Sequence, residues 1–224
     1  IASGKGFVYN YDVPTTGVQP LATITYAGIA KTAQLSNIGK IGFIKLVMYY
    51  SIFLDIAIWI LLFIITKKIF PVEKYNLLKI VTFLLVPLNL QISIHVINGL
   101  ETGLYLILLL CSFYFSMSYN YSNKRITKQT LLLSLLFSLT LLARLDFAWI
   151  MLILISGLFF TKNIRIKEAL TLVFLPIIAG SLWTIFSSFI TNGIIQSSVV
   201  SQTHLFASIN YDGIIIFLQS FLQP

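Results

Sequence analysis

Residues 46–66 read LVMYYSIFLDIAIWILLFIIT, an apolar run about as long as a helix needs to be to cross a bilayer. Lys67 and Lys68 close the run, and Pro71 discourages any continuation of the helix. The whole chain shares this character, because 58% of its residues are hydrophobic and 10% are charged, against roughly 45–50% and 25% in soluble domains. The sequence therefore predicts an integral membrane protein.

Five more apolar runs predict further spans, at residues 77–96, 103–119, 129–143, 147–161 and 168–190. Only Arg144, Leu145 and Asp146 separate two of these runs. Because each charge costs about 2.5–3.5 kcal/mol at the centre of a membrane helix, we expect a tight helical hairpin that holds both charges at the interface. The predicted fold class is all-α, a polytopic transmembrane helix bundle of about six to seven spans with an external juxtamembrane segment at the N-terminus.

We expect residues 1–224 to form a single membrane domain. In this scheme residues 1–45 are an external loop and juxtamembrane helix, with the helix at 19–34, and residues 46–224 are the transmembrane bundle. The first residue is not methionine, and the last apolar run is much shorter than the ~20 residues of a span. We therefore expect the chain to be truncated at both ends.

Lysine and arginine are distributed unevenly between the loops. Ten of the fifteen fall in three alternate loops, which the positive-inside rule assigns to the cytoplasm. Because these cations sit in short clusters between apolar runs, the net charge of +8 does not indicate a nucleic-acid partner. We expect a multi-pass protein of the cell inner (plasma) membrane, with the lipid bilayer as its partner. The ten residues are Lys67, Lys68, Lys74, Lys79, Lys124, Arg125, Lys128, Lys162, Arg165 and Lys167.

Polar residues gather on the opposite, non-cytoplasmic side of this topology, in residues 6–20, 98–102, 143–146 and 191–212. We expect their ionisable side chains to line a cavity at the membrane surface. The alternative is that the carboxylates only end helices near water. The ionisable residues in question are Asp12, Glu101, Arg144, Asp146 and His204.

Several strings, taken in their order along the chain, resemble a known family. They are GKGFVYN at 4–10 with PTTGVQPL at 14–21, NGLETGLYLILLL at 98–110, and LARLDFAWIMLIL at 142–154, followed by a last external loop. The set is similar to the bacterial GT-C type membrane glycosyltransferases, relatives of the dolichyl-phosphate-mannose protein mannosyltransferases. The resemblance covers nearly the whole chain.

This resemblance implies inverting transfer of a sugar from a polyprenyl-phosphate-linked donor to a glycan, lipid or protein acceptor on the non-cytoplasmic face. Members of the family carry an acidic motif in the first external loop, so the usual catalytic aspartate is expected upstream of Ile1. The present chain alone is then expected to be inactive. The resemblance leaves a divalent metal ion open as a cofactor.

The outer residues receive candidate roles from the resemblance. Arg144 would grip phosphate oxygens bidentately as the leaving phosphate gains charge, and its alternative role is to pair with Asp146 and pin the hairpin. Glu101 is the candidate catalytic residue, either as an acceptor of a hydroxyl hydrogen bond or as a metal ligand. The candidate substrate-binding residues are Arg144, Asp146, His204, Asp12 and Tyr9, of which the tyrosine suits stacking on a sugar ring.

Two other functions stay open. A secondary transporter would use Asp55, His95 and Glu101 as an ion pathway, although the chain has no internal repeat and its polar residues cluster at one face. A non-catalytic scaffold, formed by a degenerate or split fragment, is the third hypothesis. We interpret Asp55 as an acid that faces the bundle interior, and Cys111, the one cysteine, as a small core hydrophobe.

Overall fold

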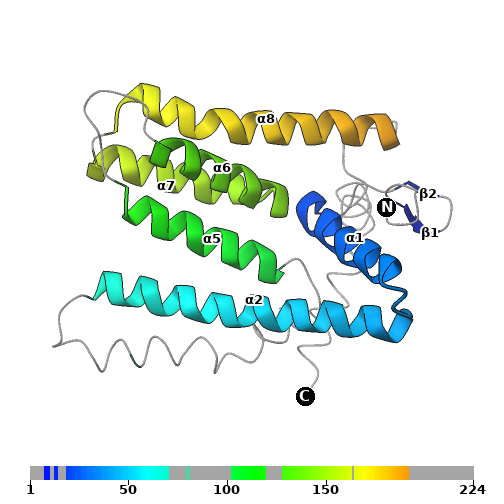
Figure 1. Cartoon of the computed structure of the whole chain (residues 1–224). Helices are drawn as coiled ribbons and strands as arrows, with labels where there is room; N and C mark the ends of the chain where they lie inside the picture. Colours follow the sequence, from blue (N-terminus) through cyan, green and yellow to red (C-terminus); the bar gives the residue numbers. More distant parts are fainter. Residues whose placement is uncertain are drawn as a thin grey trace, which may run out of the picture. The chain divides into compact units, whose positions relative to one another are not determined.

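The computed structural model describes residues 8–10, 13–14, 19–70, 80, 102–119, 128–162 and 164–191. The chain divides into two compact units, a helical unit made essentially of Gln19–Trp183 and a terminal unit made essentially of Ser3–Val18 and Thr184–Pro224. The helices are α1 (Pro20–Leu35), α2 (Lys40–Ile69), α5 (Thr102–Met117), α6 (Lys128–Ala143), α7 (Phe147–Lys162) and α8 (Ile166–Thr191) (Figure 1). In the terminal unit, β1 (Val8–Asn10) pairs antiparallel with β2 (Val13–Pro14).

The helical fold predicted from the apolar runs is confirmed in the described residues. Helices lie where the sequence predicted them, although α2 begins at Lys40 rather than at residue 46. The helix predicted at 19–34 is α1, which begins with Pro20 in its first turn. The predicted span at 77–96 lies outside the described residues apart from Ile80, and the short β1–β2 pair was not predicted.

Among the described residues, two helices, Lys40–Ile69 and Ile166–Phe189, are long and apolar enough to cross a membrane. The apolar helices α5, α6 and α7 have 16 residues each, or about 24 Å at 1.5 Å per residue, against a hydrocarbon core of about 30 Å. The number of spans therefore stays a prediction, as does the single membrane domain.

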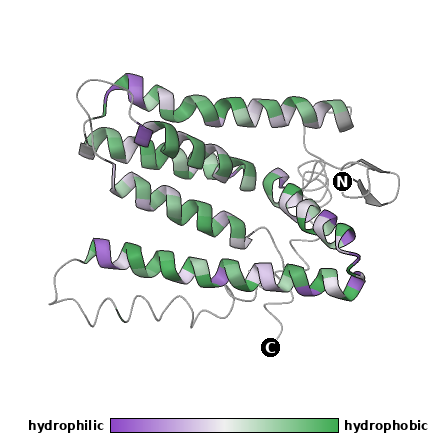
Figure 2. Ribbon diagram, viewed as in Figure 1, coloured by the Kyte–Doolittle hydropathy of each residue, from purple (hydrophilic) through white to green (hydrophobic). Residues whose placement is uncertain are grey.

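Large apolar side chains cover the outside of the helical unit, and small hydroxyl side chains lie between its helices. Figure 2 shows apolar residues along most of the length of α5 and α8 and over much of α2. Exposed examples are Phe53, Ile60, Ile153, Phe160 and Phe174. Buried polar residues in this unit are almost all serine or threonine, namely Ser51, Thr66, Ser112, Ser116, Thr130, Ser134, Ser138 and Thr140. Such an arrangement is typical of helices that pack against one another in lipid.

Hydroxyl contacts fix how α5 and α6 run beside each other. Tyr119, just past the end of α5, shares a hydrogen bond of 2.8 Å with Thr130 near the start of α6. Further along the two helices, Ser112 and Thr140 are fully buried and share a hydrogen bond of 3.2 Å. The late part of α5 thus meets the early part of α6, and the two helices are antiparallel.

A serine of α6 compensates for a proline inside α8. Pro176 lies within α8 and has no N–H, so the carbonyl of Leu172 loses the donor that would close its helical hydrogen bond. Ser134 on α6 donates its hydroxyl hydrogen to the carbonyls of Thr171 at 2.9 Å and Leu172 at 3.3 Å. Side chains that satisfy freed carbonyls are one way in which apolar helices tolerate proline.

These contacts bring the lysine-rich helix ends of the unit together. Lys68 at the end of α2 donates to Ser118 at the end of α5, where α6 begins. Since α7 turns back from α6 and α8 begins directly after α7, the end of α7 and the start of α8 lie at this same end. The cationic end, as we call it, carries Lys67, Lys68, Lys128, Arg165 and Lys167 among the described residues.

The Ser134 contact predicts a specific loss of stability. Ser134→Ala should lower the unfolding free energy by about 1–3 kcal/mol, because a buried carbonyl loses its donor. In a Pro176→Ala background, where the backbone N–H returns, the same change should cost much less. Ser138→Ala is the matched control, because its hydroxyl bonds only to the Ser134 carbonyl of its own helix. Unfolding in lipid–detergent mixtures measures all of these, and equal losses in both backgrounds would contradict the account.

Candidate functional site

The charged turn between α6 and α7 is anchored by buried residues on both sides. Ala143 and Phe147, which flank the turn, are fully buried, and the Phe147 ring lies 5.8 Å from that of Phe137. The Arg144 N–H donates to the Thr140 carbonyl at 2.9 Å, and the Arg144 carbonyl accepts from the Phe147 N–H at 3.1 Å. The predicted tight hairpin is therefore present, with Arg144, Leu145 and Asp146 as its turn.

Arg144 and Asp146 form a bidentate ion pair. Arg144 Nε donates to Asp146 Oδ1 at 3.1 Å, and Nη2 donates to Oδ2 at 2.9 Å. The two side chains keep 37% and 59% of their surface exposed. A pair this exposed contributes only about 0.2–1 kcal/mol to stability. The pairing that the sequence offered as Arg144's alternative role is the one observed.

The same guanidinium lies over an aromatic ring of α5. Its central carbon is 5.3 Å from the centroid of the Tyr105 ring, and Tyr105 is itself buried in the helical core. Of the five N–H donors of an arginine, Asp146 takes two, which leaves three. Arg144 is thus held from two sides and can still donate to a further anion.

Most of the other predicted site residues lie outside the described part of the chain. This holds for the side chains of Glu101, Asp12 and His204, and for His95. Tyr9 is in β1, between the paired residues of a two-stranded β structure where the sequence predicted a loop. The structure therefore brings together two predicted site residues, Arg144 and Asp146, and adds Tyr105 to them.

Asp55 and Cys111 lie inside the apolar helices α2 and α5. Asp55 is half-buried in α2, next to the buried Leu54, and has neither a hydrogen bond nor an ion pair within the described residues. Cys111 is half-buried and free. In the described ranges there is no group of three or more His, Cys, Asp or Glu that could hold a metal ion.

Comparisons with known proteins add no family to this geometry. No protein-family model, no curated protein and no solved structure matches the chain.

Two interacting residues were missed by the sequence reasoning. Tyr105 lies inside an apolar run, where it reads as one more core aromatic, and only its contact with Arg144 distinguishes it. Glu168 is buried at the start of α8, where its Oε2 accepts the Arg165 N–H at 3.2 Å. A capping box pairs such a glutamate with Ser or Thr just before the helix, and because Arg165 stands there instead, the sequence did not show the usual signal.

The contact between Arg144 and Tyr105 predicts a measurable coupling. A double-mutant cycle with Tyr105→Leu and Arg144→Gln should give about 0.5–1 kcal/mol, the value for a partly exposed cation–π pair. Tyr105→Phe keeps the ring face and should keep most of that coupling. Unfolding free energies of the four proteins of the cycle give the result, and additive effects would show that the ring does not hold the guanidinium.

Proposed function

We propose that this protein is a multi-pass membrane glycosyltransferase with six to seven spans, which uses a polyprenyl-phosphate-linked sugar on the outer side of the inner membrane. The exposed apolar surface supports the membrane placement. Large side chains such as Phe53, Ile60, Phe174 and Leu182 face away from the helical unit over much of α2 and α8, and water would oppose an apolar surface of this extent. Lipid accommodates the shorter helices α5 to α7 by local thinning.

The position of the charges supports the orientation. The cationic end of the helical unit collects lysines and arginines from several helices, as expected of a cytoplasmic surface. The Arg144–Asp146 turn lies at the other end, with the start of α5. The turn would then face the compartment in which lipid-linked sugars are used.

The observation that carries the proposed reaction is the arrangement of Arg144. An acceptor hydroxyl would attack the anomeric carbon of the donor, a base would take its proton, and the bond to the phosphate oxygen would break with inversion. The leaving polyprenyl phosphate gains negative charge in this step. The three remaining N–H donors of the Arg144 guanidinium, which is already held in position, would stabilise that charge by hydrogen bonding. Glu101 directly precedes α5, whose first turn carries Tyr105. We assign it to the same site, where it would orient a hydroxyl.

A second candidate function, secondary transport, is favoured by one residue. Asp55 is an acid in the middle of a helix long enough to span, and no partner compensates it among the described residues. Acids in such places often carry protons or ions. Asp55→Asn separates the two functions, because it should leave sugar transfer intact and would abolish ion-coupled transport.

Sugar transfer in membrane vesicles tests the proposal, with the protein as the cell makes it and a radiolabelled polyprenyl-phosphate sugar. Arg144→Ala should lower turnover by roughly 10²–10³-fold, the usual effect of removing a donor to transition-state charge, and Glu101→Gln should also cripple it. Arg144→Lys keeps the positive charge but loses the planar guanidinium with its paired N–H donors, so it should retain part of the activity.

Membrane insertion should be unchanged in these variants, since the ion pair adds little stability. Lys167→Ala, which removes a cation at the cationic end, is the matched control and should transfer normally. Wild-type turnover in both Arg144→Ala and Glu101→Gln would remove these residues from the site. An absence of transfer by the wild-type protein, together with ion transport lost in Asp55→Asn, would replace the enzyme by the transporter.

A further inference from the structure

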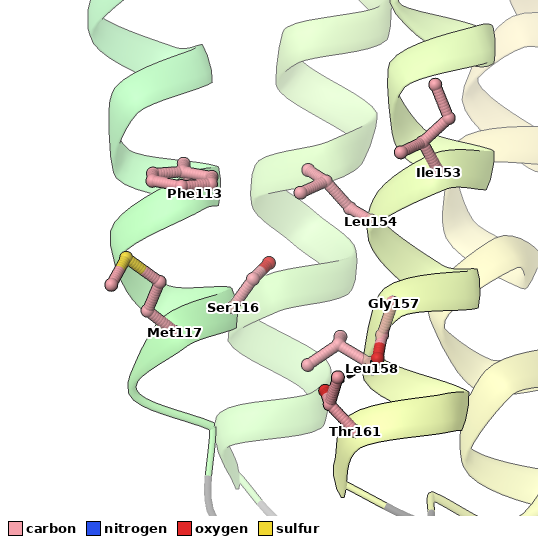
Figure 3. A pocket seen from close by; sticks show the side chains of 8 residues that line it. All are labelled: Phe113, Ser116, Met117, Ile153, Leu154, Gly157, Leu158 and Thr161. Atoms are coloured by element: carbon pink, nitrogen blue, oxygen red, sulfur yellow. Dashed lines mark hydrogen bonds between the residues drawn. The ribbon is translucent and has the colours of Figure 1, made fainter. Parts of the chain in front are cut away.

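An apolar groove of about 460 Å³ lies between α5 and α7, away from the Arg144 turn. Its volume is within the roughly 300–1,000 Å³ range of ligand sites. The walls come from Phe113, Ser116 and Met117 on α5 and from five residues of α7, among them Ile153, Gly157 and Thr161 (Figure 3). The groove is open along one side, where Ile153 is 70% exposed and Phe113 37% exposed.

The groove offers hydrocarbon contacts and little else. Its two hydroxyl groups are already used, because Ser116 donates to the Ser112 carbonyl at 2.7 Å and Thr161 to the Gly157 carbonyl at 2.6 Å. From Ile153 to Thr161 it runs about 12 Å along α7 at 1.5 Å per residue. This length is close to half of a hydrocarbon core of about 30 Å, which is one leaflet. An extended acyl chain matches both the depth and the chemistry.

A lysine lies at the same end of α5 as the groove. Lys68 of α2 lies against α5, where it donates to Ser118 and sits 4.6 Å from the Tyr114 ring centroid. Ser118 and Tyr114 directly follow the groove residues Met117 and Phe113 in sequence. In the described residues Lys68 pairs with no carboxylate and is exposed, so its charge is available to a ligand.

We propose that this groove binds an anionic phospholipid of the cytoplasmic leaflet, with one acyl chain between α5 and α7 and the phosphate at Lys68. The inference rests on the membrane placement and orientation in the proposed function, and it is independent of the sugar-transfer chemistry. Apolar burial of the chain supplies affinity, which grows with each buried CH₂. The lysine supplies the preference for a negative headgroup.

Two substitutions address the two parts of the site. A Cβ added at Gly157 meets nothing within 4 Å, so Gly157→Leu places a side chain in the groove without a clash at its base. Lys68→Gln removes the charge. Lys67→Gln is the matched control, because Lys67 lies 4.5 Å from the Phe63 ring centroid of its own helix and not against α5. Gly28→Leu on α1, where a Cβ also meets nothing, controls for the loss of a helical glycine.

Native mass spectrometry of the full chain with added phosphatidylglycerol or phosphatidylcholine measures the binding. Lys68→Gln should weaken phosphatidylglycerol binding about fivefold, the contribution of one lysine at an anionic surface, and leave phosphatidylcholine unchanged. Gly157→Leu should weaken both lipids, and soluble glycerol phosphate should compete with neither. The two control variants should bind like wild type.

Equal binding by wild type and Gly157→Leu would overturn the acyl-chain site. Equal losses in Lys67→Gln and Lys68→Gln would overturn the headgroup site. Competition by glycerol phosphate would reassign Lys68 to a free phosphate. Sugar transfer, measured in parallel in the Arg144 variants, separates a failure of this site from a failure of the proposed function.

Discussion

The hydrogen bonds from Ser134 join α6 to the carbonyls of α8 next to the proline of that helix. Without them Pro176 would leave the buried Leu172 carbonyl of α8 without a donor, which costs about 1–3 kcal/mol. Other hydroxyls of α6 make hydrogen bonds to Ser112 of α5 and to Tyr119 just past its end. A single helix thus joins its neighbours through small polar side chains while its leucines fill the remaining space.

This way of packing has a consequence for function. Serine and threonine hydroxyls make hydrogen bonds between the helices, and buried apolar side chains such as Leu133, Phe137 and Met151 fill the core. Many of the other large apolar side chains of α2, α7 and α8 point outward. Most charged residues of the described part of the unit lie near helix ends, and Asp55 in the middle of α2 is an exception. One end is cationic, and at the other Arg144 is fixed by Asp146 on one side and by Tyr105 on the other. In the orientation that we propose, this guanidinium and its free donors would lie at the membrane surface, where they would suit an anionic, membrane-bound substrate.

The apolar runs were enough to predict the helices, because their length and high hydropathy indicate helices even without a helical repeat of apolar and polar residues. The hairpin at Arg144 followed from the cost of burying two charges, and the structure has it. Sequence could not choose between phosphate binding and pairing with Asp146, because the choice depends on side-chain geometry. Nor could it pair Tyr105 with Arg144, which are distant in sequence and meet only when α5 packs on α6. The β1–β2 pair escaped prediction because its strands have only three and two residues.

The central claim is that the helical unit crosses a membrane with the Arg144 turn outside and the cationic end inside. Labelling of intact cells by an impermeant thiol reagent tests it, in a Cys111→Ser background with a cysteine at Asp146 or at Lys167, both of which are exposed. We predict that Asp146→Cys labels from outside and that Lys167→Cys labels only after permeabilisation. Labelling of Lys167→Cys in intact cells, with protection of Asp146→Cys, would contradict the account.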